Sequence, residues 1–355
     1  MNTIQANPLL GVGLHGVGAM AAANCYAPQK YVRRWSWEIY WLTQAAWCWL
    51  LWPVIGACLT IPHLAAVLAD APKDAMLASF ALGVAYGVGG TAFNLSIRYI
   101  GFALTYAIAV GLSSVVGTLL VPLWEGKLGE KLSRPGAEWI LAGVGIGALG
   151  IAVCGLAGRW KELDLRATGN TGDFSLAKGL ALSLMAGILS AVYSFAISTA
   201  AKPVVEVAAK YGAGQWKGNV AYMFANSGAF VTAAAYSLLL ARKNNSLGQL
   251  VRLADGPEPA SLTRNYFLAF LTGTLWYGQF FFYNLGQVRL GKDYDFSSWA
   301  IHMIMLVLFS NVLGVLLHEW RGSRPRTFAA VGVGLVVLVA AVVALTYGNY
   351  LGGGE

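Results

Sequence analysis

The feature of this sequence that most limits its fold is a series of long apolar runs without charged residues. One run, FAAVGVGLVVLVAAVVALTYG, covers residues 328–348, and another, GVGIGALGIAVCGLAG, covers 143–158. Crossing about 30 Å of hydrocarbon at about 1.5 Å per residue takes about 20 residues, so such runs predict transmembrane helices. Strands of a membrane barrel would instead alternate polar and apolar residues. With 57% hydrophobic and 11% charged residues, the chain is predicted to be an all-α polytopic membrane protein.

The positive charge of the chain fits a membrane protein better than a nucleic-acid-binding protein. The formal net charge is +8, but the Lys and Arg residues lie almost entirely in short gaps between apolar runs, where the positive-inside effect places them. Most lie in the gaps after odd-numbered runs, which favours both termini outside the cytoplasm. The four cysteines fall inside apolar runs without metal-type spacing, so we interpret them as packing residues. Because MNTIQANP has no basic segment, we expect no cleaved signal peptide.

The apolar runs predict ten transmembrane helices separated by short gaps. Even the longest polar gaps are too short to fold as separate domains, so function must lie within the helix bundle. The predicted helices cover residues 9–29, 37–60, 74–98, 101–123, 138–157, 176–201, 217–241, 264–288, 296–318 and 326–348.

Pieces of the first half of the chain recur in the second half in the same order. FNLSIRYIG (93–101) resembles YNLGQVRLG (283–291), and the first and sixth helices both end with a proline, Pro28 and Pro203. These matches predict a first five-helix repeat at 1–158, a linker at 159–175 and a second repeat at 176–355. Because five is odd, the repeats are inverted, an architecture typical of transporters that work by alternating access. The alternative is that small residues and Leu runs resemble each other by chance.

Few titratable residues lie within the predicted helices. Glu38 opens the second helix, His15 lies within the first and His302 within the ninth. These three residues are the candidates for proton coupling, because intramembrane ionisable groups are costly and often functional, and His changes charge near neutral pH. Each also has a structural interpretation: Glu38 as a partner of its helix dipole, and each histidine as a hydrogen-bonding residue between helices.

Two predicted helices carry polar and aromatic stripes. On the eighth helix Trp276, Gln279 and Tyr283 lie three or four residues apart. On the third helix Tyr86, Gly90 and Asn94 follow one another at four-residue spacing, with Arg98 one turn further. Apart from Gly90, these residues are the six candidates for substrate binding. An aromatic ring packs against the C–H face of a sugar while amides and hydroxyls bind its hydroxyl groups. The alternative is that they join helices or form an aromatic belt.

Five segments of the chain carry a resemblance to a known family. They are NCYAPQKYVRRWSWE (24–38), RYIGFALTYAIAVGLSSVVGTLLVP (98–122), AAKP (200–203), WYGQFFFY (276–283) and YDFSSWAIHM (294–303). Together they resemble the L-rhamnose/proton symporter family, within the drug/metabolite transporter superfamily. The loops at 158–175 and 242–263 do not match it closely. The residues that match its recurring motifs are His15, Glu38, Asn94, Arg98, Gln279, Tyr283, Asp295 and His302.

The resemblance implies ten helices in two inverted repeats and proton-driven uptake of a deoxyhexose across the bacterial inner (plasma) membrane. The leading hypothesis is therefore a proton-coupled importer of L-rhamnose, with the lipid bilayer as its surroundings and no cofactor besides the coupling proton. The alternative is an exporter, or an importer of another small metabolite, from the same superfamily. An integral-membrane enzyme is disfavoured because no nucleophile motif, metal-ligand cluster or pair of intramembrane carboxylates occurs in the sequence. A passive channel is disfavoured because no filter motif occurs.

Overall fold

The fold consists of helices throughout the part of the chain that can be described. The computed structural model describes residues 7–166, 175–257, 259–290, 297–316, 320 and 322–352, and these contain no strand. Nine of the described helical segments are long and apolar enough to cross a membrane. The prediction of an all-helical, multi-pass membrane protein is therefore confirmed.

The helices follow the predicted apolar runs. In the first half they are α1 (Pro8–Asn24), α2 (Trp37–Ala45), α3 (Trp52–Thr60), α4 (Leu64–Asp70), α5 (Lys73–Thr105), α6 (Gly111–Trp124), α7 (Leu128–Leu132) and α8 (Ala137–Arg166). In the second half they are α9 (Leu176–Phe195), α10 (Lys202–Lys210), α11 (Asn219–Lys243), α12 (Leu262–Leu290), α13 (Ser298–Leu316) and α14 (Pro325–Gly352). Short π-helical segments η2 (Ala46–Leu51), η3 (Tyr106–Val110) and η4 (Ala196–Ala200) and 3₁₀ segments η1 (Ala27–Tyr31), η5 (Gly214–Trp216) and η6 (Leu247–Leu250) interrupt or follow them.

The connections differ from the sequence-based expectation in three places. The short helices α4, α7 and α10 lie in gaps between the predicted transmembrane helices, where no helix was predicted. No non-helical residue separates α5, η3 and α6, so the predicted break near residues 99–100 is helical. Finally, α8 continues to Arg166, into the predicted linker at 159–175, of which residues 167–174 lie outside the described part of the chain. The apolar runs therefore predict the membrane spans, while helices also occur in the gaps and continue beyond the runs.

The 29-residue helix α12 is long enough to cross a membrane but is not among the nine candidate spans. Its polar residues Thr272, Thr274, Gln279 and Asn284 lower its hydropathy. It is also the helix on which the sequence predicts a stripe for substrate binding. A helix that carries polar groups at membrane depth faces protein or a cavity rather than lipid.

The described residues form two compact units, each built from both halves of the chain. Unit 1 comprises Met1–Ala23, Gly89–Phe195 and Phe282–Glu355, and unit 2 comprises Asn24–Val88 and Ala196–Phe281. The helices α5 and α12 are each divided between the units, the first after Val88 and the second after Phe281.

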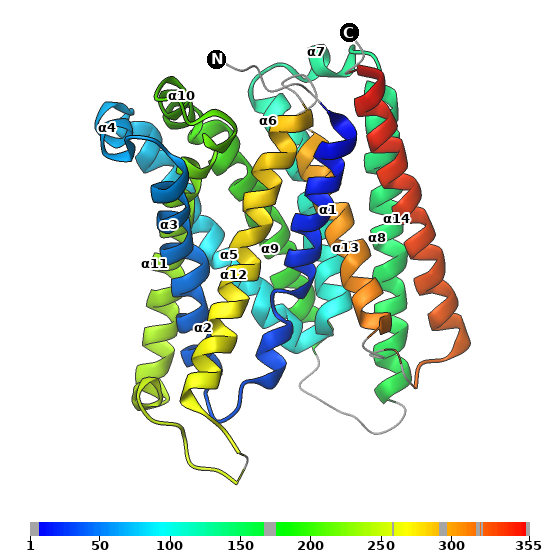
Figure 1. Cartoon of the computed structure of the whole chain (residues 1–355). Coiled ribbons are helices and arrows are strands. Elements are labelled where there is room, and N and C mark those ends of the chain that lie inside the picture. The colour runs from blue at the N-terminus through cyan, green and yellow to red at the C-terminus, as the bar shows by residue number, and fades with distance from the viewer. Residues whose placement is uncertain are drawn as a thin grey trace. The chain divides into compact units, whose positions relative to one another are not determined.

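In unit 1 the helices α8 and α14 lie side by side and antiparallel (Figure 1). A Cβ on Gly136 would meet the backbone of Gly348, so small residues allow this close approach. At the other end of the pair, Asp164 accepts hydrogen bonds from the backbone N–H of Arg324 (2.9 Å) and the hydroxyl of Thr327 (2.8 Å). The carboxylate therefore ties the end of α8 to the start of α14 and places a negative charge near the positive end of that helix.

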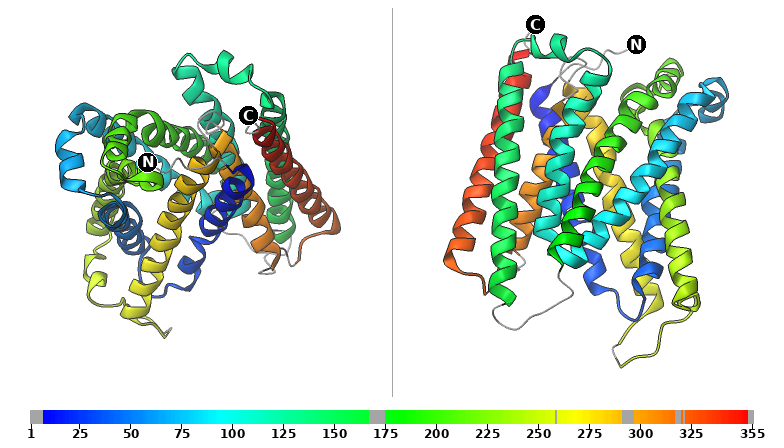
Figure 2. Two further views of the ribbon diagram at one scale, coloured as in Figure 1. Left: turned by 45° about the horizontal axis from the view of Figure 1, so that its top comes forward. Right: turned by 180° about the vertical axis from the view of Figure 1, so that it is seen from behind.

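In unit 2 the helix α11 packs against α2 and α3, and α4 lies beside α10 (Figure 2). Gly83 of α5 faces the backbone of Ala225, and Gly228 of α11 faces the backbone of Phe80, with no room for a Cβ at either glycine. Backbones that approach this closely gain dispersion contacts, which hold helices together where lipid removes the hydrophobic driving force.

Candidate functional site

The predicted site residues fall into two groups, one in each compact unit. His15, Asn94, Arg98, Tyr283 and His302 belong to unit 1. Glu38, Tyr86, Trp276 and Gln279 belong to unit 2. Asp295, which matched a family motif, lies outside the described residues.

In unit 1 the structure brings His15, Tyr283 and His302 together into a ring cluster, which we call the histidine cluster. The ring centroids of His15 and Tyr283 are 5.1 Å apart, those of Tyr283 and His302 5.4 Å, and those of the two histidines 6.0 Å. All three pairs meet edge to face. Both histidines have no exposed surface, and Tyr283 is 4% exposed. The cluster is buried and is contributed by α1, α12 and α13.

Glycines make room for the histidine cluster. A Cβ on Gly286 of α12 would lie 2.8 Å from Cδ2 and 2.9 Å from Nε2 of His15. A Cβ on Gly11 of α1 would lie 3.0 Å from the carbonyl oxygen of Gly286. The sequence therefore seats the His15 ring directly over the backbone of α12, because neither helix carries a side chain at the crossing.

The imidazole of His15 has no hydrogen bond within the described part of the chain. Neither ring nitrogen finds a partner, although the residue is fully buried. Most buried polar atoms are hydrogen-bonded, so such a group calls for an explanation, for example a site for a proton, a water or a ligand. A neutral imidazole has one donor and one acceptor nitrogen and can take up a second proton.

Trp299 extends the histidine cluster toward α6. Its ring centroid lies 5.8 Å from that of Tyr283, and its indole N–H donates to the carbonyl oxygen of Ser113 at 2.9 Å. The Ser113 hydroxyl in turn donates to the hydroxyl of Ser190 on α9 at 2.9 Å. Trp299 lies in the YDFSSWAIHM segment, but the sequence analysis did not single it out. The remaining candidates of unit 1, Asn94 and Arg98, lie on α5, the first buried and the second exposed.

In unit 2 two predicted residues, Tyr86 and Trp276, meet around a third that sequence reasoning missed, Trp49. The ring centroid of Trp49 lies 5.5 Å from that of Trp276 and 6.2 Å from that of Tyr86, and the latter two are 6.4 Å apart. Trp41 joins them, 5.8 Å from Trp49. We call these four residues the aromatic cluster. The side-chain amide of Gln279 donates to the carbonyl oxygen of Trp276 one turn earlier, at 2.9 Å.

The π-helical segment η2 explains why Trp41 and Trp49 meet. In a regular helix, residues eight positions apart point about 80° away from each other, since each residue turns the helix by about 100°. A π turn holds one extra residue, which removes about 100° and places both side chains on one face. Trp49 lies in η2. Pro53 follows the run AWCWLLW directly and cannot donate a backbone hydrogen bond to the carbonyl of Trp49, so a local sign of an irregular helix was present.

The aromatic cluster contains buried hydrogen-bond donors without acceptors. The indole N–H groups of Trp41 and Trp49 have no partner within the described part of the chain, and both side chains are fully buried. An indole N–H can only donate a hydrogen bond, so it needs an oxygen or nitrogen acceptor. The cluster therefore offers flat aromatic surface together with two unused donors.

Glu38, unlike the unpartnered polar atoms of the two clusters, has hydrogen-bond partners within the protein. Its Oε1 accepts hydrogen bonds from the hydroxyl of Ser246 (2.6 Å) and the side-chain amide of Asn244 (3.0 Å). It lies in the first turn of α2 and is 3% exposed. A carboxylate at this position also compensates the positive end of the helix dipole. The arrangement ties the start of α2 to the turn that follows α11.

Comparison with known proteins identifies the family. The family model described as L-rhamnose-proton symport protein (RhaT) matches residues 4–349. This chain belongs to that family. The membership confirms the family that the five segments predicted, and it assigns the chain to the transporters rather than the enzymes. Within the described residues no group of three or more His, Cys, Asp or Glu side chains could hold a metal ion.

Relatives in the symporter family match the chain over almost its full length. An L-rhamnose-proton symporter of Mannheimia succiniciproducens is 35% identical over 346 residues, which cover 96% of this chain and 98% of the relative. One from Cronobacter sakazakii is 35% identical over 335 residues, covering 94% of this chain and 95% of the relative. One from Yersinia pestis is 34% identical over 337 residues, covering 94% of this chain and 96% of the relative.

Proposed function

We propose that this protein is a secondary transporter that carries L-rhamnose, a deoxyhexose, into the bacterial cell together with a proton, by alternating access. The observation that carries the proposal is the match to the L-rhamnose-proton symport family over residues 4–349. The three relatives described above are L-rhamnose-proton symporters. Since they are bacterial and the chain is a multi-pass membrane protein, its place is the inner membrane. No cofactor besides the coupling proton is required.

The aromatic cluster of unit 2 is proposed to bind the sugar. A deoxyhexose has apolar C–H and methyl surface that packs on aromatic rings, and hydroxyl oxygens that accept hydrogen bonds. Trp276 and Tyr86 supply ring surface, and the buried indole N–H groups of Trp41 and Trp49 supply the donors. Gln279 is proposed to add an amide from the same turn of α12 as Trp276.

In unit 1, Asn94, Arg98 and Tyr283 are proposed as substrate residues in their own right. Asn94 offers a buried amide on α5, which can donate to and accept from a sugar hydroxyl. Tyr283 offers both a ring and a hydroxyl within the histidine cluster. Its position there makes it the proposed link between sugar binding and the proton.

The histidine cluster is proposed to carry the coupling proton. His15 and His302 would take up a proton from the outside and release it inside after the transporter reorients. Two positive charges about 6 Å apart repel by about 3 kcal/mol at an effective dielectric constant of about 20, so the pair would hold one proton rather than two. Tyr283 lies within the distance, about 6 Å, at which an aromatic ring stabilises a cation.

Glu38 remains a third candidate for coupling, but we assign it a structural role first. Its carboxylate already accepts hydrogen bonds from Ser246 and Asn244. A proton carrier must lose and regain its charge in each cycle, and here each loss would leave a buried hydroxyl donor without its charged acceptor.

The proposed architecture is ten transmembrane helices in two inverted repeats, with α12 as the span beyond the nine candidates. The first repeat covers residues 1–158, the second 176–355, and 159–175 link them. The sequence matches between the halves support this arrangement. So does the equivalence of α5 and α12, each of which passes from unit 2 into unit 1 within its length. Inverted repeats that exchange conformations provide alternating access.

The test is rhamnose-driven proton movement into proteoliposomes. In a weakly buffered medium, addition of L-rhamnose should raise the external pH as protons enter with the sugar, and a protonophore should abolish this rise. Empty liposomes are the control. A pH change with another small metabolite but none with L-rhamnose would support the alternative substrate, and accumulation in inverted vesicles would support an exporter.

A further inference from the structure

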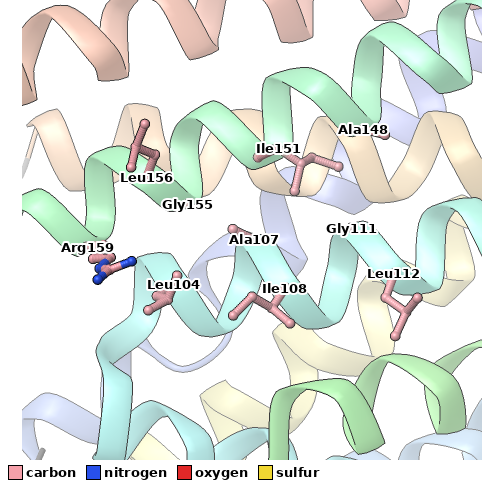
Figure 3. Close-up of a pocket in the computed structure, with 11 residues that line it drawn as sticks. Leu104, Ala107, Ile108, Gly111, Leu112, Ala148, Ile151, Gly155, Leu156 and Arg159 are labelled. Carbon is pink, nitrogen blue, oxygen red and sulfur yellow. The ribbon is translucent and has the colours of Figure 1, made fainter. Parts of the chain in front are cut away.

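A groove of about 440 Å³ opens on unit 1 between α8 and the segment formed by η3 and the start of α6 (Figure 3). Small residues leave the space: Ala107 and Gly111 on one wall, and Ala148, Ala152 and Gly155 on the other. The volume lies within the range of small-molecule sites, which is about 300–1,000 Å³. The groove is separate from both the histidine and the aromatic clusters, since it shares no lining residue with either.

The walls of the groove are unsuited to a sugar. Apart from Arg159, every lining side chain is Ala, Gly, Leu or Ile, so a sugar hydroxyl would find no side-chain partner there. From Ala148 to Arg159 the groove follows α8 for about 16 Å, at about 1.5 Å per residue. Ala152 and Leu156 are exposed, so the groove opens to the surroundings at a depth where α8 lies in the membrane. A long, narrow, apolar trough of this kind fits a hydrocarbon chain.

The one charged lining residue lies at an end of the groove. Arg159 is seen beside Leu104 in Figure 3, five residues before the candidate span ends at Asp164. Its side chain is exposed and forms no ion pair within the described part of the chain. Asp164, five residues later on α8, forms its ion pairs with Arg324 and Arg326 instead. An arginine near a helix end reaches the polar interface, where its guanidinium can bind a phosphate through two parallel hydrogen bonds.

We propose that this groove binds one acyl chain of an anionic phospholipid, with the phosphate of that lipid held by Arg159. Ordinary surrounding lipid exchanges along any apolar helix surface. This site combines a fixed trough with a positive charge at its end, and basic sites on transmembrane helices favour anionic headgroups. Part of the wall, including Ala107, belongs to the π-helical segment η3. The bound chain would fill the space beside that segment and stabilise its packing on α8.

The experiment measures lipid binding to the full-length, delipidated protein by native mass spectrometry, with phosphatidylglycerol and phosphatidylcholine of identical acyl chains. The variant Arg159→Gln should bind phosphatidylglycerol about fivefold more weakly, the change expected for one basic side chain, and phosphatidylcholine as before. The matched control is Lys161→Gln, which removes the same charge two positions later. Lys161 lies over the ring of Trp320 at 4.8 Å and does not line the groove. It should leave both lipids unaffected.

A second variant tests the trough itself. Ala152 is exposed within the groove, so Ala152→Phe fills the trough without displacing buried residues. It should weaken binding of both lipids, and a photoactivatable acyl chain that labels residues 148–156 in the unaltered protein should no longer do so. Equal phosphatidylglycerol binding by Arg159→Gln and the unaltered protein would overturn the assignment of the phosphate. Unchanged labelling in Ala152→Phe would overturn the assignment of the chain.

Discussion

Replacement of Gly286 by alanine tests whether the histidine cluster couples the proton. The new Cβ would lie 2.8 Å from Cδ2 of His15 and 2.9 Å from its Nε2, and also 2.9 Å from the carbonyl oxygen of Gly11. Carbon atoms in contact are normally about 3.5–4.0 Å apart, so the ring must shift by about 0.7 Å or more. Because backbone blocks one direction, the His15 ring must leave its place beside Tyr283 and His302.

The short contacts of the new Cβ set the expected losses of stability and of transport rate. Overpacking a well-packed site costs about 1–3 kcal/mol. The matched control is Gly278→Ala on the same helix, where a Cβ would have no neighbour within 4 Å. Both variants gain the same helix propensity of about 1 kcal/mol, so the difference in unfolding free energy between them isolates the clash. Displacing a reacting group by about 1 Å can cost about 100-fold in rate, so proton-driven uptake should fall roughly ten- to a hundredfold in Gly286→Ala alone.

The assay is uptake of labelled L-rhamnose by proteoliposomes under an imposed proton gradient, together with thermal unfolding of each variant in detergent. Adding His15→Ala to Gly286→Ala removes the ring that the Cβ meets, so the stability loss should be smaller than the sum of the two single changes. If Gly286→Ala and Gly278→Ala transport at the same rate, the position of the His15 ring does not matter and the coupling proposal is wrong.

Three further predictions follow from the two clusters and from Glu38. Trp49→Phe should weaken L-rhamnose binding about two- to tenfold in a calorimetric titration, because one donor of about 0.5–1.5 kcal/mol is lost. The control Trp52→Phe should leave the affinity for L-rhamnose unchanged, since the indole N–H of Trp52 already donates to Thr274 at 2.9 Å. Equal effects of Trp49→Phe and Trp52→Phe would contradict the proposed sugar site. His302→Gln should abolish uptake driven by a proton gradient while exchange of internal for external sugar persists, and loss of both would contradict a role in coupling alone. Glu38→Gln should retain gradient-driven uptake to within about threefold and lower the melting temperature, because an amide oxygen is a weaker acceptor than a carboxylate; complete loss of coupling with normal stability would make Glu38 the proton carrier.

The membrane-spanning helices were predictable because the signal is local. About 20 consecutive apolar residues must span the hydrocarbon, and each segment meets or fails this requirement by its own residues alone. Thus the run at 37–60 corresponds to Trp37–Thr60, and the run at 326–348 to α14. The helix α12 shows the limit of the signal, since Gln279 and Asn284 lower its hydropathy although it is a continuous helix.

The grouping of the site residues was not predictable from local patterns. The sequence identified His15 and His302 separately, but only the packing of α1 against α12 and α13 brings them within 6.0 Å. Trp49 was missed because a π-helical segment changes the face on which it lies. The partners of Glu38 lie in a turn more than 200 positions later, where nothing in the sequence marks them.

The most direct test of the central claim is accumulation of radiolabelled L-rhamnose in proteoliposomes with an inward proton gradient, with and without a protonophore, and with a sodium gradient as the control. The proposed mechanism predicts accumulation above the external concentration with the proton gradient, its loss with the protonophore, and equilibration only with the sodium gradient. Equilibration without accumulation under the proton gradient, or accumulation that persists with the protonophore, would contradict proton-coupled rhamnose import.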